Sequence, residues 1–499
     1  MMKKLFLPLL LMVAVSAQAA DKIATPHSDQ GSENPVLTIE GGQVQGVLAD
    51  DHPDVFVYRG IPYAAPPIKE NRWKEPQPIV PWKGVKICDT FGHPSYQAIQ
   101  YPGGYFTEWG YGKEAPYSED CLYLNVWTKA PGQVNKKLPV ALWIHGGGFR
   151  EGWGSEPEFD GQEWGAKDVV LVSINYRLGV FGFLVHPALT AESPHHSSGN
   201  YGILDQIEAL KWIKKNIAQF GGDPNNVTIF GQSAGGGSVR TLCESPLARG
   251  LFHKAVIMSA QGLAIPDANG NMIGGRYSGG TFADAEANAK KVFDWAGLTD
   301  LQKMRQASTE TVFALNTLYY QINNDGQQAS GPMAFMRRGL PFMPMIDGYV
   351  CVKSFDDATR EGSLADVPYM IGFTLNDMGN MAPNIVEFCK VRQQKGGKAW
   401  AYQFARPEFV DAFDQAACAG TYVNVHLRSP YTNITKADIA HRGKTLGIDY
   451  SKTWSCYKGG EQHCGKCGTC VERREAFALA GIDDKTAYLE APTTFPLTT

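Results

Sequence analysis

Short apolar runs of strand length recur between residues 60 and 404 and alternate with stretches of helical patterning. Four of them cover residues 138–144, 169–175, 227–231 and 367–373. Each run is apolar at successive positions and is bounded by Gly, Asn or Pro, which is typical of strands buried on both faces of a parallel sheet. We therefore expect an α/β fold in which helices cover a mostly parallel sheet.

Residues 205–220 have the spacing of an amphipathic helix, with apolar side chains at Ile207, Leu210, Ile213 and Ile217. The residues that follow, 221–224, read Gly-Gly-Asp-Pro, and glycine and proline there end a helix. With 499 residues the chain is longer than one compact core usually supports, so we expect two units.

The N-terminus has the three-part pattern of a secretory signal. Lys3 and Lys4 precede an apolar run at residues 5–15, and small residues follow up to Ala20. We expect residues 1–20 to be a cleaved signal peptide that directs the protein to a periplasm or out of the cell. The alternative, a membrane anchor, needs roughly 20 apolar residues to span a bilayer, and neither this run nor a later one is that long.

The charge balance favours small molecules as partners. Lysine and arginine number 46 against 50 aspartate and glutamate residues, which gives a formal net charge of -4. Such a chain has no field that attracts nucleic acid or an anionic membrane surface. The sequence carries no signal for an oligomeric state.

A serine between two glycines lies where a predicted strand meets a predicted helix. Residues 231–235 read Gly-Gln-Ser-Ala-Gly, after the strand at 227–230 and before a helix-compatible stretch at 236–243. A sharp strand-to-helix turn exposes the hydroxyl at the helix N-terminus, where free N–H groups stabilise developing negative charge. We therefore expect Ser233 to be a nucleophile; the alternative is an ordinary turn.

A second glycine cluster follows the predicted strand at 138–144. Residues 145–149 read His-Gly-Gly-Gly-Phe, and N–H groups without neighbouring side chains can point at an oxyanion. We expect the N–H groups of Gly147 and Gly148, together with that of Ala234, to form an oxyanion hole. The alternative is a flexible glycine turn.

These motifs resemble those of the type-B carboxylesterase and lipase family, which includes the cholinesterases. Residues 220–236 match the family's active-site signature, and residues 119–126, Glu-Asp-Cys-Leu-Tyr-Leu-Asn-Val, match its second signature. Further similar stretches lie at residues 59–64, 175–179 and 200–206. The resemblance covers about residues 37–405. It implies an α/β-hydrolase fold and a serine carboxylesterase that acts on small-molecule esters through a Ser233 acyl-enzyme, without a cofactor.

The resemblance also implies roles for three further residues. Asp377 lies five residues after Gly372, where most relatives carry the glutamate that orients the catalytic histidine. An aspartate is shorter by one methylene and can do the same; the alternative is a solvated loop carboxylate. Cys88 and Cys121 match the family's first disulfide, and an oxidising compartment favours that bond over two unpaired thiols.

The family pattern stops near residue 405. After the predicted strand at 398–405, relatives carry the catalytic histidine, then a glutamate and an aromatic strand, and this order is missing here. A serine hydroxyl needs an imidazole to accept its proton, and the first histidine after that strand is His426. We expect an α/β-hydrolase domain at residues 21–405, truncated at its C-terminal end, with either His426 as its base or no base.

Residues 406–491 resemble the C-terminal part of a different enzyme, 7-cyano-7-deazaguanine synthase. The resemblance rests on residues 407–413, 427–446 and 453–460 and on Cys456, Cys464, Cys467 and Cys470. Gaps of two residues let thiolates converge on one tetrahedral Zn²⁺. We therefore expect a small zinc-stapled module, followed by a tail at residues 492–499. The alternative is disulfide pairing of these cysteines after export.

Three other functions compete with secreted ester hydrolysis. A catalytically dead esterase-like domain would be a binding protein, as among adhesion relatives of the family. A remnant of the synthase would need a Ser-Gly-Gly-x-Asp-Ser nucleotide loop, and residues 278–283, Ser-Gly-Gly-Thr-Phe-Ala, lack its end. The last alternative is an artefactual reading frame that joins two genes.

Overall fold

The computed structural model describes residues 34–98, 116–260, 265–266, 272–273, 281–323, 342–373, 389–396, 399–403, 435–453, 462–465 and 468–489. Several predicted features lie outside these ranges: the signal peptide at residues 1–20, Asp377, His426, Cys456, Cys467 and the tail at residues 492–499. Within the described ranges, no helix is both long enough and apolar enough to cross a membrane.

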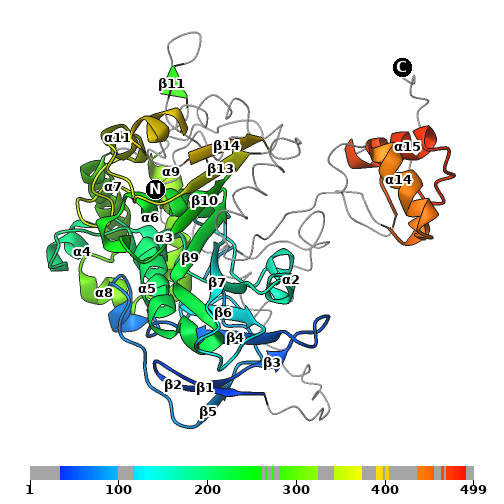
Figure 1. Cartoon of the computed structure of the whole chain (residues 1–499). Coiled ribbons are helices and arrows are strands. Elements are labelled where there is room, and N and C mark those ends of the chain that lie inside the picture. The colour runs from blue at the N-terminus through cyan, green and yellow to red at the C-terminus, as the bar shows by residue number, and fades with distance from the viewer. Residues whose placement is uncertain are drawn as a thin grey trace, which may run out of the picture. The chain divides into compact units, whose positions relative to one another are not determined.

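Nine strands of the described chain form the main sheet (Figure 1). In sheet order they are β14 (Ala399–Gln403), β13 (Tyr369–Phe373), β10 (Lys254–Met258), β9 (Gly222–Gln232), β7 (Leu138–Ile144), β8 (Val170–Ile174), β6 (Tyr123–Thr128), β4 (Phe56–Pro62) and β3 (Val47–Leu48). Neighbours from β14 to β8 are parallel, and β6, β4 and β3 pair antiparallel. The predicted mostly parallel sheet is therefore confirmed.

Two smaller sheets accompany the main one. The first has the order β1 (Val36–Ile39), β2 (Gly42–Gln45), β5 (Val85–Ile87), and the second pairs β11 (Ile265–Pro266) with β12 (Met272–Ile273).

The central strands of the main sheet are buried on both faces. In β7, Val140, Leu142 and Ile144 belong to a large hydrophobic cluster, whereas Ala141 and Trp143 belong to a second, smaller one. Successive side chains of a strand point to opposite faces, so the two clusters lie on opposite sides of the sheet. This double burial explains why the run is apolar at successive positions.

Helices cover both faces of the sheet (Figure 1). Apolar residues of α5 (Tyr201–Asn216) and α6 (Ala234–Glu244) belong to the larger cluster, and Ala166 of α2 (Gln162–Ala166) packs against the smaller one. The remaining described helices are α3 (Gly179–Phe183), α4 (Pro187–Glu192), α7 (Phe282–Trp295), α8 (Leu301–Gln306), α9 (Thr309–Asn323), α11 (Phe355–Glu361), α14 (Lys436–Thr445) and α15 (Gly468–Leu479). Short 3₁₀ turns lie at Lys69–Asn71, Pro157–Phe159, Ile217–Phe220, Pro246–Ala248 and Tyr450–Lys452.

The helix predicted at residues 205–220 is confirmed as α5 and the 3₁₀ turn that continues it. Gly221 ends this turn with φ 77°, in the left-handed region. Glycine adopts that conformation without steric cost, so the stop signal in the sequence has a backbone cause.

Residues 435–489 contain α14, α15 and the 3₁₀ turn at Tyr450–Lys452. Arg473 of α15 donates to the carbonyl of Tyr450 at 2.9 Å and to the hydroxyls of Thr453 and Thr486, both at 2.8 Å. It also lies 3.3 Å from the Asp484 carboxylate. One guanidinium therefore connects α15 with the chain on both sides of it.

Candidate active site

Ser233 lies between the end of β9 and the start of α6, in the strand-turn-helix context that the motif requires. Its backbone has φ 55° and ψ -121°. A non-glycine residue in such a sparsely populated region is strained by roughly 1–3 kcal/mol and persists only where its surroundings impose it. The Ser233 N–H donates to the carbonyl of Met258 at 3.0 Å, and its carbonyl accepts from Gly237 at 2.9 Å. Ser233 itself is partly exposed.

The glycines of the motif are required by close backbone approach. A Cβ atom on Gly235 would lie 2.1 Å from the carbonyl oxygen of Ile144 in β7. A Cβ atom on Gly231 would lie 2.5 Å from the carbonyl carbon of Gly235. Both distances are far below van der Waals contact, so the two glycines let α6 approach the sheet and hold the serine turn.

The glycine loop after β7 lies beside the nucleophile. A Cβ atom on Gly146 would lie 3.4 Å from the Cβ of Ser233. Gly147 and Gly148 have φ 93° and 63°, which favours glycine at both positions. A side chain on Gly147 is also excluded because its Cβ would lie 2.0 Å from the carbonyl oxygen of Glu151.

Three backbone N–H groups remain available beside Ser233. Within the described ranges, no group accepts a hydrogen bond from the N–H of Gly147, Gly148 or Ala234. Ala234 is the first residue of α6, and the first N–H groups of a helix have no partner inside it. Their use as an oxyanion hole stays a prediction.

Two side-chain amides hold the chain that follows the glycine loop. Gln97 accepts from the N–H of Gly152 at 2.9 Å and donates to its carbonyl at 3.1 Å. Asn175 accepts from the N–H of Gly154 at 2.7 Å. The motif at 145–149 gave no indication of Gln97, because the contact joins segments 55 residues apart.

His145, the first residue of that motif, is not placed to act as the base. Its ring is fully buried, stacks on Tyr176 with centroids 4.3 Å apart, and bonds the Gly146 carbonyl through Nδ1 at 3.0 Å. Burial lowers the pKa of His145 to about 4. A Cβ atom on Gly152 would lie 2.5 Å from its Nδ1 and 3.2 Å from the carboxyl of Glu156. Burial raises the pKa of Glu156 to about 8, so burial favours the neutral form of both groups.

The strands that lead to the other predicted catalytic residues end at the same sheet edge as β9. Four adjacent parallel strands have their carboxyl ends at Gln232, Met258, Phe373 and Gln403. Asp377 follows β13 by four residues, and His426 follows β14 in the chain. Both therefore come, in the chain, after strands that end at the sheet edge of Ser233. Both residues lie outside the described ranges, so their roles stay predictions.

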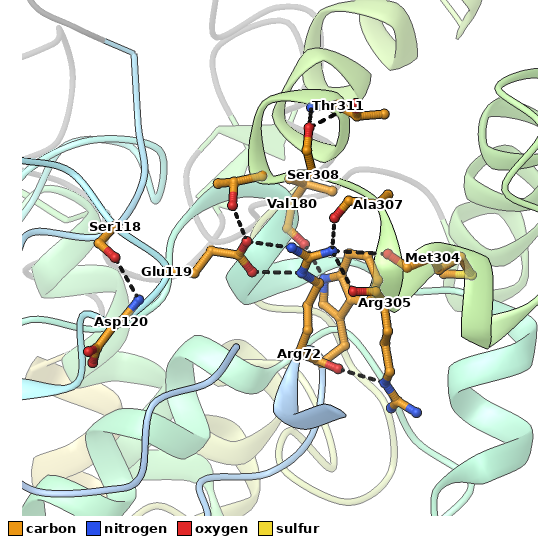
Figure 2. Close-up of polar contacts among 12 residues, drawn as sticks. Arg72, Ser118, Glu119, Asp120, Val180, Met304, Arg305, Ala307, Ser308 and Thr311 are labelled. Atoms are coloured by element: carbon orange, nitrogen blue, oxygen red, sulfur yellow. Dashed lines mark hydrogen bonds and ion pairs between the residues drawn. The ribbon is translucent and has the colours of Figure 1, made fainter. Parts of the chain in front are cut away.

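Glu119, which begins the second signature stretch, lies in a buried polar cluster (Figure 2). Arg72 donates to it through Nε at 2.7 Å and through Nη2 at 2.6 Å, and Thr309 donates to it at 2.6 Å. Arg72 also donates to the carbonyls of Met304 and Ala307 at 3.0 and 2.8 Å. The cluster joins α8 and the start of α9 to the chain before β6, so this signature residue has a structural role.

A second buried ion pair joins two of the other family-like stretches. The side chains of Arg177 and Asp205 are 2% and 0% exposed, and Nη2 and Nε of Arg177 reach the carboxylate at 2.6 and 2.8 Å. The next residue, Gln206, donates to Ser238 of α6 at 2.9 Å. These stretches therefore hold α5 against the sheet and the nucleophile helix.

Cys88 and Cys121 are both free, buried thiols in this structure, and their pairing as a disulfide stays a prediction. The Cys121 thiol is hydrogen bonded to Ser95, whereas the Cys88 thiol lies 3.7 Å from the carbonyl oxygen of Lys86. Burial raises the pKa of the Cys88 thiol to about 12.

Two of the four predicted zinc ligands are described. Cys464 and Cys470 are 6% and 0% exposed and belong to one small buried cluster, against which Tyr488 packs. Cys456 and Cys467 lie outside the described ranges. Among the residues that the structure describes, no group of three or more His, Cys, Asp or Glu side chains is placed to hold a metal ion. The zinc site stays a prediction.

The parallel sheet with helices on both faces and the strained serine turn after β9 define the α/β-hydrolase class. The sequence profile of the Carboxylesterase family matches residues 33–445. The chain therefore belongs to the carboxylesterase family, a family of carboxylic ester hydrolases. The matched range continues past residue 405, where the sequence predicts a domain boundary.

Individual relatives agree with this assignment. Fumonisin B1 esterase of Sphingopyxis macrogoltabida is 34% identical over 415 residues, covering 82% of this chain and 67% of the relative. Liver carboxylesterase of Sus scrofa is 35% identical over 396 residues, covering 77% and 64%. A solved structure titled thermophylic PNB esterase has a TM-score of 0.56 and 32% identity, covering 69% of this chain and 64% of that one.

The chain spans about two thirds of the length of these relatives. The relatives named above are esterases, and the predicted resemblance to 7-cyano-7-deazaguanine synthase receives no support from these comparisons.

Proposed function

We propose that the protein is a serine carboxylesterase that hydrolyses small-molecule carboxylic esters through an acyl-enzyme on Ser233. The observation that carries the proposal is the strained turn of Ser233 at the N-terminus of α6, directly beside the glycine loop. Such strain persists where function needs the geometry, and membership of the carboxylesterase family supports the same reaction.

In the proposed reaction the Ser233 hydroxyl attacks the ester carbonyl, the alcohol leaves, and water then hydrolyses the acyl-enzyme. The N–H groups of Gly147, Gly148 and Ala234 stabilise the oxyanion of each tetrahedral intermediate. His426 accepts the serine proton and passes it to the leaving alcohol, and Asp377 orients the imidazole. The shared sheet edge of β9, β13 and β14 supports these last two assignments.

Fluorophosphonate labelling followed by mass mapping tests the nucleophile. We expect the label on Ser233 of the wild-type protein, and neither label nor hydrolysis of p-nitrophenyl acetate in Ser233→Ala. Ser193→Ala, which changes a serine after α4, is the matched control and should label like the wild type. A label on another serine would refute the proposal. A folded wild-type protein without label or turnover would favour the alternative, a catalytically dead esterase-like binding protein.

A pair of histidine variants tests the base. His426→Ala should lose esterase activity while its melting temperature stays within a degree or two, because a general base contributes to the reaction and not to packing. The wild-type rate should rise with pH through an imidazole pKa near about 6.5. His441→Ala on the exposed face of α14 is the control, and equal activity of both variants would eliminate His426 as the base.

Export and metal binding are separate proposals. Residues 1–20 are proposed as a cleaved signal peptide, which the N-terminal sequence of the mature protein would test.

Residues 406–491 are proposed as a zinc-binding module with Cys456, Cys464, Cys467 and Cys470 as ligands, supported by the common burial of Cys464 and Cys470. Protein folded under reducing conditions should contain one equivalent of zinc and lose it in Cys470→Ser; two disulfides and no zinc would contradict this.

A further inference from the structure

Arginine side chains deep in this protein are paired with carboxylates. The buried arginines and the partners that each reaches within 4.0 Å are Arg72 with Glu119, Arg177 with Asp205, Arg240 with Asp356, Arg305 with Glu192 and Arg392 with Asp366. This pattern is expected, because desolvating an unpaired guanidinium is unfavourable.

Arg150 departs from this pattern. Its Nε atom is buried and has no hydrogen-bond partner among the described residues, while the residue as a whole is partly exposed. Among the residues that the structure describes, no carboxylate forms an ion pair with the Arg150 guanidinium, and no group accepts a hydrogen bond from its Nε atom. A buried donor without a partner requires an explanation, and a ligand that supplies the acceptor is one.

The position of Arg150 in the fold indicates which ligand it meets. Arg150 lies two residues after Gly148, and its N–H donates to the Gly147 carbonyl at 3.1 Å. The preceding residue, Phe149, accepts from the N–H of Gly179 at 2.7 Å. The Arg150 backbone is thus held on the glycine loop that adjoins Ser233.

Distances along the chain bring the guanidinium within reach of a bound ester. Two residues of extended chain span at most about 7 Å, so the Arg150 backbone lies within that distance of the Gly148 N–H. The charged head extends several bonds further, and its planar donors fit a carboxylate in a two-point contact. The carboxyl of Glu156 accepts from the Trp153 N–H at 3.2 Å, and no ion pair between it and Arg150 is present in the described part of the chain.

We propose that Arg150 binds a free carboxylate of the substrate, so that the enzyme prefers esters that carry a second, unesterified carboxylate. This inference rests on the proposed function of Ser233. The reacting carbonyl lies at the glycine loop, and the second carboxylate, a few bonds away, fills the vacant acceptor position of Arg150. Neutral esters of the same size lack this contact.

The carboxylate can belong to either half of the ester, and two pairs of probes separate these cases. Monoethyl succinate compared with ethyl butyrate tests a carboxylate on the acid half. 3-Acetoxypropionate compared with propyl acetate tests one on the alcohol half. For each pair the quantity measured is the ratio of kcat/KM for the charged ester to kcat/KM for the neutral ester, from acid release in a pH-stat.

Arg150→Met keeps the length of the side chain and removes its charge. We expect this variant to lower the ratio about 10- to 100-fold for at least one pair, on the usual worth of a hydrogen bond to a charged group. Arg150→Lys should recover part of the loss. Arg249→Met, which removes an exposed arginine bonded to the Ser363 carbonyl, is the matched control and should leave both ratios at wild-type values.

A binding measurement keeps this inference separate from the proposed reaction. Calorimetric titration of monoethyl succinate and 3-acetoxypropionate into Ser233→Ala reports affinity without turnover. Addition of Arg150→Met to that background should weaken binding of at least one probe about 10-fold or more. Unchanged ratios and unchanged affinities would overturn the inference while leaving Ser233 as the nucleophile. If the wild-type protein shows no turnover but the probes bind in a way that depends on Arg150, the inference is supported and the esterase proposal is refuted.

Discussion

The ion pairs around the main sheet and the cluster around Arg473 are embedded in the protein differently. Arg177 and Asp205 lie within a large hydrophobic core, and their side chains are almost fully buried. Arg473 and Asp484 lie in a segment of two short helices, where their side chains retain 8% and 12% exposure. In the first region apolar burial holds the elements and the ion pair positions them; in the second a single cation connects most of the elements.

The largest effect should come from breaking the pair in the large core. Arg177→Met leaves Asp205 buried without its cation, and we expect the free energy of unfolding to fall by about 3–5 kcal/mol. Urea denaturation followed by tryptophan fluorescence measures this change. A midpoint equal to that of the wild type would show that the Asp205 carboxylate needs no counter-charge in this core.

The buried carboxyl of Glu156 has no cation among its described neighbours, and its contribution to the free energy of unfolding should depend on pH. Burial raises the pKa of Glu156 to about 8, whereas an unfolded glutamate has a pKa of 4.5. The folded state therefore holds this proton more tightly, and the carboxyl destabilises the fold progressively as pH rises from about 4.5 to about 8. Glu156→Gln should match the wild type at pH 4.5 and exceed its free energy of unfolding by on the order of 3 kcal/mol at pH 8.

Urea midpoints of Glu156→Gln and of the wild type at these two pH values show whether the stability difference between them grows as pH rises. Glu475→Gln, which changes an exposed glutamate of α15, is the control. A Glu156→Gln variant whose advantage is the same at both pH values would indicate that the carboxyl is charged in the folded protein.

Replacement of Arg473 tests how much this one side chain contributes to the stability of the segment that contains α14 and α15. Arg473→Met should lower the local stability of residues 435–489 by about 2 kcal/mol, since several hydrogen bonds and one largely buried ion pair are lost. Hydrogen exchange should become faster at α15 amides while the protection of β7 is unchanged. Equal loss of protection in both places would show that the two regions unfold as one cooperative unit, contrary to the comparison.

The smallest effect is expected at an exposed pair on α5. Lys211 and Glu208 lie 3.0 Å apart, and their side chains are 56% and 33% exposed. Lys211→Met should change the free energy of unfolding by less than about 0.5 kcal/mol. A loss above 1 kcal/mol in urea denaturation would mean that surface ion pairs contribute on the same scale as the pair of Arg177.

Features that depend on neighbouring residues in the chain could be predicted. The strand predicted at residues 138–144 has the same first and last residues as β7. The turn of Ser233 lies between a strand and a helix, as the motif indicates. Apolar periodicity and the steric freedom of glycine determine these features within a few residues. The same reasoning identified the glycine loop, because its glycines directly follow a buried strand.

Features that depend on segments far apart in the chain could not be predicted. The sequence gives no indication that Ser95 is the hydrogen-bond partner of the Cys121 thiol. Likewise, the sequence marks Glu119 as part of a signature stretch without indicating Arg72, its partner 47 residues away.

The sequence by itself therefore determined the mostly parallel sheet, the glycine loop and Ser233 as the candidate nucleophile, because these follow from short-range sterics and from burial patterns within single strands. The tertiary structure alone decided which buried charges are paired, that burial favours the neutral forms of Glu156 and His145, and that the Nε atom of Arg150 has no hydrogen-bond partner among the described residues. The physical reason is that desolvation and Coulomb energies depend on distances in space between distant segments. Spacing along the chain does not specify those distances until the sheet has formed.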